Sequence, residues 1–577
     1  MTMWRKRWRI APPAPQVLFE RFQTLNPLVV QVLYNRGITA SEEVQRFFEG
    51  VVPDDNPFRI RGVSEAVSLI RRTIEADLAI AVYGDYDADG VTATAILVQT
   101  LRALGGRVEA YIPDRIEEGY GLNAEAVTAL ADKGIRLLIT VDCGIRSLEE
   151  VALARARGIQ TVITDHHHVG PALPPADAVI NPRRPDSPYP FPDLAGAGVA
   201  FKLAQALLRV NRRVPLATIK AEGRELLAAE ELLDLVALGT IADMVPLVGE
   251  NHVLVKRGLE RINHAPRPGL RALMQICDVE PGKVTARTIS FVLAPRVNAA
   301  GRIGEALTAF ELLVAPDLAS ALPLAQDLET LNQERRALTH EVRERARTMV
   351  LDVDDNPPLL FAASPEFPAG IVGLAASRLL EEFYRPVVVV EEGEEFSKGS
   401  ARSIPEFHIT EALDRVSDLL VRYGGHAAAA GFTVRTENLE ELQRRLVDLA
   451  REELAEVVLT PSLLVDAELP LNMLSWDLHE DLEALAPFGY GNRSPTLVSR
   501  DVRILSARAV GAEGRHLKLY VADEQGRSWS AIAFRQGAWI GRLPDVVDLA
   551  YHLQRNEWNG RTTLQLNVLD IHPQGMD

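Results

Sequence analysis

The sequence contains very little cysteine, with Cys143 and Cys277 as the two examples in 577 residues. Two cysteines build neither the disulfide framework of a small secreted domain nor the all-cysteine cage of a structural zinc site. This scarcity favours a reducing compartment, and we expect the protein in the cytoplasm.

Long apolar runs are also lacking. No segment approaches the roughly 18 consecutive apolar residues that a membrane-spanning helix needs. The basic residues within 1–15 are not followed by the apolar core of a signal peptide. We therefore expect no membrane segment, and for a chain of 577 residues we expect roughly three or four domains.

A positive net charge is missing as well, because the formal net charge is −17. An acidic chain repels the phosphate backbone of a nucleic acid at long range. This does not exclude a nucleic-acid partner, since a metal site concentrates acidic residues and a nucleic-acid groove needs only a local basic lining.

The chain is organised around residues 79–90, which read AIAVYGDYDADG. A strand-like run at 78–82 is followed by Asp85, Asp87 and Asp89, and then by an apolar, helix-like segment. Buried carboxylates spaced two residues apart are costly to hold together unless a cation neutralises them. A solvated acidic turn is the alternative for this segment taken alone.

Short β-rich segments alternate with amphipathic segments from residue 78 to residue 181. We expect strands at 78–82, 107–112, 136–141, 160–164 and 178–180, and helices near 91–104, 123–133, 147–157, 197–208 and 224–238. Strands that alternate with helices in this way predict an α/β fold with a doubly wound parallel sheet.

Two more of these strands end in polar side chains, as the first one does. Asp142 follows one strand, the run Asp165, His166, His167 and His168 follows the next, and Asp243 follows a later apolar helix. Taken singly, Asp142 fits a helix cap, Asp243 fits a turn, and the histidines fit a surface loop. Because the carboxyl ends of parallel strands meet at one edge of the sheet, we expect these side chains to converge there.

Carboxylates with one or two imidazoles suit hard or borderline divalent cations. Oxygen ligands favour Mg²⁺ or Mn²⁺, and imidazole shifts the preference toward Mn²⁺. The number of carboxylates suits two ions that share one bridging carboxylate, an arrangement that activates water for phosphoryl displacement.

The rest of the chain divides by composition. We expect an N-terminal extension (1–60) packed on the first domain (61–322), a connecting helix (323–350), a smaller α/β domain (351–456) and a β-rich region (457–577). The β-rich region has alternating runs, the last two of which are separated by Asn559-Gly560, a hairpin signal. These runs predict an OB-like barrel, a fold that binds single strands.

The barrel region also carries basic and aromatic side chains suited to a single-strand groove. They are Arg508, Arg515, His516, Lys518, Tyr520, Trp529, Arg535 and Trp558. For Tyr520 and Trp529, a place in the barrel core is an equal alternative.

Eight motifs together resemble the DHH phosphoesterase superfamily. DYDADG, VDCG, TDHHH and GTIADMVPL carry the resemblance to its catalytic domain, and PRVNAAGR, GIVGLAASRL, KGSARS and YGGHAAAAGF extend it to a DHHA1-type partner domain. Within the superfamily, the order of motifs is similar to that of the bacterial single-strand-specific 5′→3′ exonucleases.

The resemblance implies a role for each residue of the acidic edge. The metal ligands would be Asp85, Asp87, Asp89, Asp142, His166 and Asp243. Asp142 would bridge the two ions, and Asp85 would be a ligand or a close partner of one. His167 would face the scissile phosphate, with Asp165 orienting the adjacent imidazole, while His168 is expected to face solvent.

The resemblance also implies a substrate-binding set. Its members are Arg115, Tyr120, Arg296, Asn298, Arg302, Ser400, Arg402, Gly425 and His426. Arg302, Ser400 and Arg402 would hold a 5′-terminal phosphate. A structural ion pair remains the alternative for Arg296, and a packed core position the alternative for His426.

The function implied is a metal-dependent, single-stranded-DNA-specific 5′→3′ exonuclease of DNA repair and recombination. Single-stranded DNA would be its substrate, a helicase and a single-strand-binding protein are candidate partners, and a monomer is expected. One alternative is a DHH phosphoesterase acting on short oligonucleotides or nucleoside bisphosphates. The other is a non-catalytic replisome scaffold. A third domain and a full set of ligand residues argue against these two.

Overall fold

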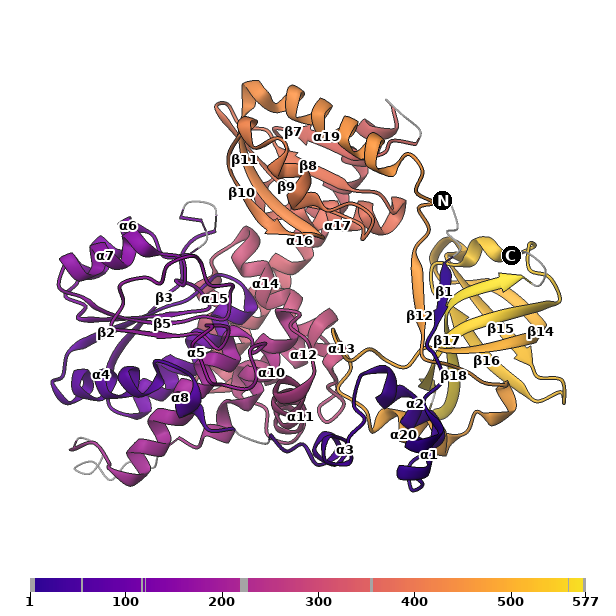
Figure 1. The fold of residues 1–577 in the computed structure, drawn as a ribbon, viewed down its shortest axis with the longest axis horizontal. Coiled ribbons are helices and arrows are strands. Elements are labelled where there is room, and N and C mark those ends of the chain that lie inside the picture. The colour runs from indigo at the N-terminus through magenta and orange to yellow at the C-terminus, as the bar shows by residue number, and fades with distance from the viewer. Residues whose placement is uncertain are drawn as a thin grey trace.

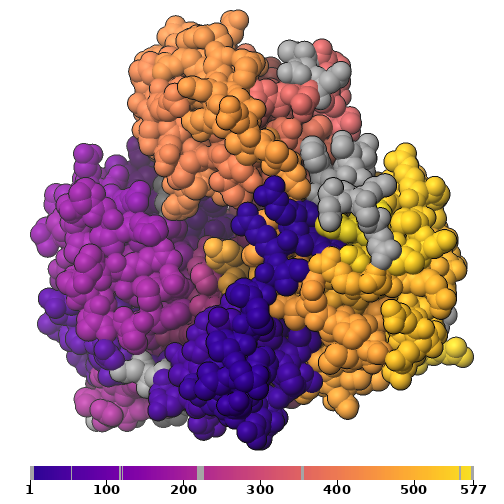
Figure 2. Space-filling view, turned by 45° about the vertical axis from the view of Figure 1, so that its right-hand side comes forward, coloured from indigo at the N-terminus to yellow at the C-terminus, as the bar shows by residue number. Residues whose placement is uncertain are grey.

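The computed structural model describes residues 6–52, 55–115, 118–119, 121–217, 227–352, 356–558 and 560–573. Figure 1 shows an α/β domain at the left, a smaller α/β domain at the top and a β-barrel at the right. The N-terminal segment, in indigo, runs between the first domain and the barrel in both Figure 1 and Figure 2.

The first domain contains a parallel five-stranded sheet in the order β3-β2-β4-β5-β6. Its strands are β2 (Ala79–Tyr83), β3 (Arg107–Tyr111), β4 (Leu137–Val141), β5 (Gln160–Thr164) and β6 (Ala178–Ile180). The chain order reverses between β2 and β4, and a topological switch point of this kind opens a crevice at the carboxyl ends of the strands.

Helices cover both faces of this sheet. Helices α4 (Val63–Glu75), α5 (Ala88–Ala103) and α8 (Gly196–Arg213) share a core with one face, and α6 (Ala124–Asp132) and α7 (Leu148–Ala156) share a core with the other. Alternate residues of β2 point to opposite cores, Ile80 and Val82 to one and Ala81 and Tyr83 to the other. The predicted doubly wound fold is confirmed.

A helical layer completes the first domain. It consists of α10 (Leu233–Ala242), α11 (Gly249–His264), α12 (Pro268–Ile276), α13 (Ala286–Thr288), the π-helical turn η3 (Ile289–Leu293), α14 (Ala294–Ile303) and α15 (Ala306–Val314). The helix expected at 224–238 begins only at Leu233, after a 3₁₀ turn at Ala229–Leu232, and residues 218–226 lie outside the described part of the chain.

The connecting helix is longer than predicted. Helix α16 spans Leu318–Leu351, 34 residues, with Pro323 inside it. The expected start at residue 323 was wrong because proline favours a first turn, whereas the cap here is Asp317, whose carboxylate accepts a hydrogen bond from the Ser320 amide. At 1.5 Å per residue the helix is about 50 Å long.

The second domain is built on a mixed five-stranded sheet in the order β10-β11-β9-β8-β7. Its strands are β7 (Leu360–Ser364), β8 (Val387–Glu391), β9 (Phe396–Arg402), β10 (Leu420–His426) and β11 (Ala429–Arg435), with helices α17 (Ala369–Phe383), α18 (Ile409–Asp414) and α19 (Leu439–Leu454). Strands β7 and β8 are parallel, and the other pairs are antiparallel.

The C-terminal domain is a closed barrel, as predicted. Its strands are β14 (Leu497–Val510), β15 (His516–Ala522), β16 (Ser528–Ala533), β17 (Val546–Trp558) and β18 (Arg561–Pro573), with the short β13 (Ala467–Glu468) beside β14. Pairing of β14 with β17 closes the ring. Strands β17 and β18 pair as an antiparallel hairpin up to Trp558↔Arg561, although Asn559 of the predicted turn lies outside the described residues.

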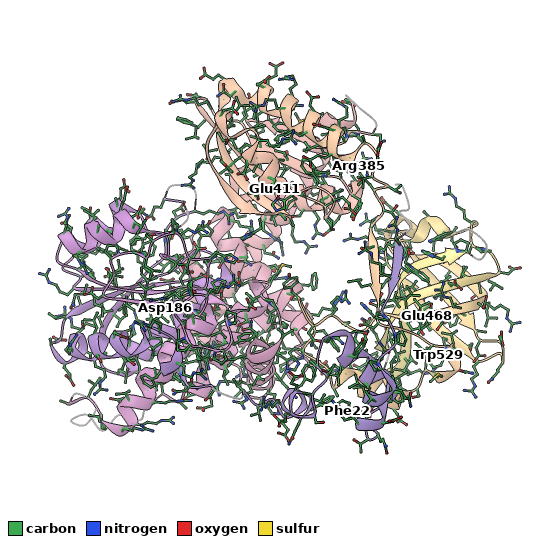
Figure 3. All side chains as sticks on the ribbon, viewed as in Figure 1. Phe22, Asp186, Arg385, Glu411, Glu468 and Trp529 are labelled. Carbon is green, nitrogen blue, oxygen red and sulfur yellow. The ribbon has the colours of Figure 1, made fainter. Side chains whose placement is uncertain are left out.

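The barrel candidates divide between its two faces. Arg508 lies opposite Lys518 on the neighbouring strand, and Tyr520 is exposed. Trp529 instead packs against the barrel core, the alternative that the sequence left open (Figure 3). Trp558 is a residue whose side chain is outside the described part of the structure.

The N-terminal extension corrects one expectation, because most of its core contacts are with the barrel rather than with the first domain. Strand β1 (Arg7–Ile10) pairs with β12 (Ser462–Val465), which leads from the second domain to the barrel. The extension contains helices α1 (Gln16–Arg21), α2 (Pro27–Asn35) and α3 (Ser41–Glu49). Val29, Val32 and Leu33 are buried in the barrel core, while Phe47 stacks on His252 of the first domain.

None of the helices in the described ranges is both long and apolar enough to cross a membrane.

Candidate active site

The acidic segment after β2 folds into the start of helix α5. Asp87 caps this helix, and its Oδ1 accepts hydrogen bonds from the amides of Asp89 (2.9 Å) and Gly90 (3.0 Å). Asp85, two residues before the cap, is buried. The DYDADG motif therefore forms a helix N-terminus, where partial positive charge from the backbone amides favours nearby carboxylates.

Asp89 links this segment to a second helix. Its two carboxylate oxygens accept hydrogen bonds from the amides of Gly196 (2.6 Å) and Ala197 (2.9 Å), at the start of α8. A side chain at position 196 would place its Cβ 2.6 Å from Oδ1 of Asp142. Gly196 thus allows α8 to approach two acidic side chains closely.

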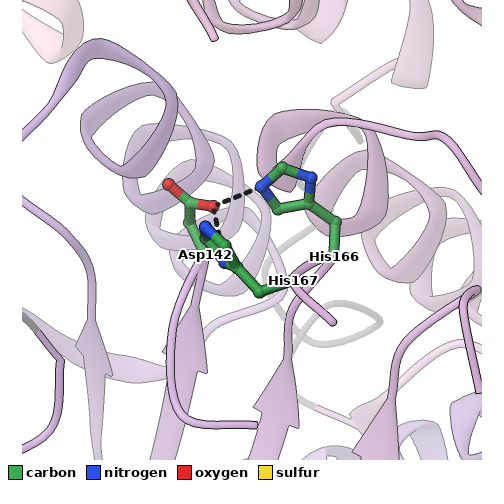
Figure 4. A group of neighbouring side chains, drawn as sticks. All are labelled: Asp142, His166 and His167. Carbon is green, nitrogen blue, oxygen red and sulfur yellow. Dashed lines mark ion pairs between the residues drawn. The ribbon is translucent and has the colours of Figure 1, made fainter. Parts of the chain in front are cut away.

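Asp142 follows β4 in a left-handed conformation, with φ of 59°. Non-glycine residues adopt this conformation rarely, and it often marks functional sites. Figure 4 shows both neighbouring histidines directed at one of its carboxylate oxygens. That oxygen lies 3.0 Å from Nε2 of His166 and 4.0 Å from Nδ1 of His167.

His166 lies at the centre of the carboxylates. Besides Asp142, its Nε2 lies 3.7 Å from Oδ2 of Asp243, at the end of α10, and 3.9 Å from Oδ2 of Asp89. Burial and the neighbouring His167 lower the pKa of His166 to about 3, so the ring is neutral and its nitrogen lone pair is available to a metal. Four separate chain segments therefore meet at one nitrogen.

The carboxyl groups of this cluster have raised pKa values. Burial, together with the charges of neighbouring aspartates, raises the pKa of Asp85, Asp142 and Asp243 well above the usual range and raises that of Asp89 to about 7. Within the described chain, Oδ1 of Asp85 is buried without a hydrogen-bond partner. Divalent cations would neutralise the charge of these buried carboxylates and give Oδ1 of Asp85 a partner. The donor set fits Mn²⁺ or Mg²⁺.

The ligand atoms fall into overlapping groups that suit more than one ion. In each group they lie within 4.8 Å of one another: Asp85 with Asp87 and Asp142, Asp89 with His166 and Asp243, and Asp142 with His166 and His167. Asp142 belongs to two of the groups, the position that a bridging carboxylate requires.

His167 is held by Asp165 rather than by the metal ligands. Nδ1 of His167 lies 2.8 Å from Oδ1 of Asp165, which also accepts the amides of His166 and His167. Burial opposes protonation of His167, but the hydrogen bond and the charge of Asp165 outweigh it and raise the pKa of His167. Asp165 thus fixes both the orientation and the protonation of the His167 ring.

A group of arginines lies between the two α/β domains. Nη1 of Arg302 donates to the Gly370 carbonyl at the start of α17 (3.3 Å), and Nη1 of Arg402 donates to Oγ of Ser400 (3.0 Å). Burial and the charges of Arg115, Arg335 and Arg402 lower the pKa of Arg302 to about 10. Guanidinium groups that repel one another in a partly buried place favour an anion between them.

Two other substrate candidates make structural contacts. Arg296 forms a half-buried ion pair with Glu329 of α16 (2.7 Å), the alternative that the sequence left open. Oδ1 of Asn298 accepts a hydrogen bond from the Ala88 amide (2.8 Å), which ties α14 to the acidic segment.

The candidates of the loop after β3 are described in part. The Arg115 guanidinium lies 4.7 Å from the centre of the Tyr86 ring. Tyr120 lies outside the described residues.

The second domain reaches back to the histidine run. His426 is exposed at the end of β10, and its ring centre lies 5.9 Å from that of His168. Gly425 precedes it with φ of 153°. His168, expected to face solvent, is exposed but faces this other domain.

Arg183 was not among the residues predicted for the site. Its charge lowers the pKa of Asp243, against the larger effect of burial, which raises it. Its position shortly after β6, at the same edge of the sheet, is a signal that the sequence offered.

Comparison with known families agrees with this geometry. A model described as the DHH family, N-terminal domain, matches residues 79–240, and one described as the DHHA1 domain matches residues 356–452. The fold and the acidic site are therefore those of a DHH-type protein with its DHHA1 partner domain.

The match of the barrel and the relatives similar over the full length identify the family within the DHH-type proteins. A model described as the RecJ OB domain matches residues 465–570. The single-stranded-DNA-specific exonuclease RecJ of Bacillus subtilis is 36% identical over 573 residues, which cover 98% of this chain and 71% of the relative. That of Dickeya dadantii is 38% identical and covers 95% of this chain and 96% of the relative. The chain belongs to the RecJ family.

Solved structures support the same assignment. The crystal structure of RecJ from Thermus thermophilus in complex with Mn²⁺ matches with a TM-score of 0.83 and 32% identity, covering 99% of this chain and 80% of that one. The corresponding Mg²⁺ complex matches with a TM-score of 0.77 and 31% identity, covering 99% and 79%.

Proposed function

We propose that this protein is a metal-dependent exonuclease that hydrolyses single-stranded DNA from its 5′ end. The observation that carries the proposal is the convergence of Asp89, Asp142 and Asp243 on Nε2 of His166, within one edge of the sheet. Relatives named single-stranded-DNA-specific exonucleases align with this chain over almost its whole length.

The metal centre would use two ions, Mn²⁺ or Mg²⁺. We assign Asp85, Asp87, Asp89, Asp142, His166 and Asp243 to it, with Asp142 between the ions. When bound, the ions would supply an activated water and a clamp for the displaced phosphoryl group. Asp89 keeps the start of α8 in place, so the same carboxylate would serve both the fold and the metal.

His167 would act on the scissile phosphate. Asp165 orients its ring and keeps it protonated to higher pH, so that Nε2–H meets the charge that develops on the phosphate oxygens. Asp165 itself accepts four hydrogen bonds and is placed to support His167 rather than to bind an ion.

The 5′ polarity would come from the arginines between the domains. We propose that Arg302, Arg402 and Ser400 bind a 5′-terminal phosphate, with Arg115 and His426 at the edge of the same pocket. A pocket that accepts a chain end explains removal of nucleotides from that end rather than internal cleavage. Arg296 and Asn298 would support this wall through Glu329 and Ala88.

The cellular process, the compartment and the partners are also proposed from the resemblance to the RecJ family. The protein would act in DNA repair and recombination in the cytoplasm, as a monomer, with a helicase and a single-strand-binding protein as partners. Both cysteines are free, as a reducing compartment requires. Our proposed domain division keeps the extension at 1–60 and the last two domains at about 351–456 and 457–577. The first domain then ends near residue 317, because α16 (Leu318–Leu351) replaces the expected connecting helix at 323–350.

The test is digestion of three substrates in Mn²⁺: a 5′-labelled single strand, the matching duplex and a dinucleotide. We expect labelled mononucleotide from the single strand alone, and its loss in Asp142→Ala but not in Asp186→Ala, which changes an exposed surface aspartate. Cleavage of the dinucleotide alone would favour a phosphoesterase of short substrates, and full activity of Asp142→Ala would refute the metal assignment.

A further inference from the structure

A large open cavity of about 1690 Å³ adjoins the proposed metal centre. It lies between helices of the first domain, the linker at residues 484–494, and strands β17 and β18 of the barrel. Its lining includes Ala242 and Met244, the residues on either side of Asp243. A strand held at the metal ions would therefore leave them along this cavity on its way to the barrel.

Several apolar and aromatic side chains of the lining are exposed, Phe534 and Trp476 among them, and three are exposed most. Met244 is 69% exposed, Phe291 is 70% exposed and Tyr490 is 62% exposed. Single exposed apolar residues need no explanation, but a group of three in one cavity indicates a binding surface.

Met244 is fixed in a strained backbone conformation. Its φ of 61° is in the left-handed region, which non-glycine residues adopt rarely. The chain just after it is held by the linker, because the Leu247 amide donates to the Tyr490 carbonyl (2.7 Å). A Cβ at Gly491 would lie 3.0 Å from Cβ of Pro246, and the φ of 75° at Gly491 favours glycine as well.

Tyr490 and Phe291 are fixed by different elements. The turn that carries Tyr490 is closed by paired hydrogen bonds between Gly489 and Asn492 (2.8 and 3.2 Å). Phe291 belongs to the π-helical turn η3, a distortion frequent at functional sites, and the Arg287 guanidinium lies 5.2 Å from its ring centre. All three side chains are thus presented by ordered backbone.

Charge does not dominate this cavity. Its lining includes the cations Lys256, Arg287, Arg493 and Arg555, but also the carboxylates Glu260, Glu381, Glu480 and Glu483. Phosphate attraction would therefore be largely balanced by repulsion. Exposed rings and a thioether instead suit the faces of unpaired bases, which stack on such groups whatever their sequence.

We propose that Met244, Phe291 and Tyr490 form a stacking platform for the bases just 3′ of the scissile bond. The inference rests on the proposed exonuclease function and adds positioning residues that lie outside the metal and phosphate sites. The platform would hold the strand between the metal ions and the barrel, so that the next phosphate enters the site after each cleavage.

The first test is steady-state digestion of a 5′-phosphorylated 20-nucleotide strand in Mn²⁺ by Phe291→Ala and Tyr490→Ala. Stacking on one ring typically strengthens binding by about 5- to 150-fold. We expect KM to rise within this range while kcat changes little, since the contact is made before and during cleavage. Tyr490→Trp and Phe291→Tyr should restore KM.

A matched control is Phe396→Ala. Phe396 is 40% exposed and carries an arginine, Arg435, at the same 5.2 Å, but lies on β9 outside the cavity. This variant should keep the wild-type KM. Because the platform acts by stacking, the KM ratio of Tyr490→Ala to wild type should be the same at low and high salt, whereas a phosphate contact would lose its effect as salt rises.

The second test uses binding without cleavage, in EDTA. A strand carrying 2-aminopurine at successive positions from the 5′ end should show quenched fluorescence at positions seated on the platform, and Phe291→Ala and Tyr490→Ala should remove the quenching there. Unchanged KM and unchanged quenching in an active enzyme would refute the platform. Failure of the wild-type protein to digest the strand would instead refute the proposed function.

Discussion

Stabilisation of the protein by Mn²⁺ should increase steeply with pH. Asp89 has its pKa raised from 3.8 to about 7 by burial and by the neighbouring Asp87. Between these values the folded, metal-free protein keeps a proton that the unfolded chain has released. Its free energy of unfolding therefore falls as pH rises through this window. Asp85, Asp142 and Asp243 have pKa values raised in the same direction and add to the effect.

The size of the effect follows from Asp89. A shift of roughly three pKa units at 1.36 kcal/mol each corresponds to about 4 kcal/mol of lost stability once the carboxyl ionises without a cation. A divalent ion binds only after this proton has left, so its stabilising effect grows over the same range. About two of these three units lie above pH 5, which corresponds to about 2.7 kcal/mol. At about 2–4 °C per kcal/mol for a domain of 150–250 residues, the Mn²⁺-induced rise in Tm should be roughly 5–10 °C larger at pH 8 than at pH 5.

The assay is thermal unfolding of the full chain, with 1 mM MnCl₂ or with EDTA, at several pH values. Asp243→Asn should flatten the pH dependence, because it removes one of the raised carboxyls. Asp186→Asn should leave it unchanged, because Asp186 is exposed and paired with Arg184. A Mn²⁺-induced shift that is equal at pH 5 and pH 8 would refute the reasoning.

Three further outcomes follow from the site. In Asp165→Asn, His167 loses the charge that raises its pKa, so the alkaline limb of the pH–rate profile should move to lower pH and kcat should fall about 10- to 100-fold; an unmoved limb would contradict this. Arg402→Met should raise KM about 10- to 100-fold for a 5′-phosphorylated strand, the value of a charge-assisted hydrogen bond. The same variant should leave a 5′-hydroxyl strand unaffected, and equal losses would argue against a phosphate pocket. Removing residues after about 460 should weaken binding of long strands, measured by fluorescence anisotropy, more than it slows cleavage of short ones.

The sheet of the first domain could be predicted closely from the sequence. The strands expected at 160–164 and 178–180 coincide with β5 and β6, those expected at 107–112 and 136–141 differ by one residue at one end, and the one expected at 78–82 is shifted by one residue. Parallel strands covered on both faces appear as uninterrupted apolar runs bounded by polar residues, which marks their limits clearly. The convergence of the aspartates followed from the same pattern, because strand direction alone decides which edge they reach.

The arrangement of the domains could not be predicted in this way. The apolar face of α2 specifies burial but not a partner, and it lies on the barrel core rather than on the nearer domain. Arg296 illustrates the same limit at the site, since its motif also suits a phosphate ligand and only the fold brings Glu329 beside it. Contacts between residues far apart in sequence depend on packing that local patterns do not encode.

A hydrogen bond from β1 to the last strand of the barrel bears on the order in which the molecule folds during synthesis. Nε1 of Trp8 donates to Oδ2 of Asp570, a residue 562 positions further along (2.8 Å). At roughly 5–20 residues per second, about half a minute to two minutes of translation separate the two. During that interval the Trp8 indole lacks its partner on the nascent chain, so this contact forms only after the barrel has been made.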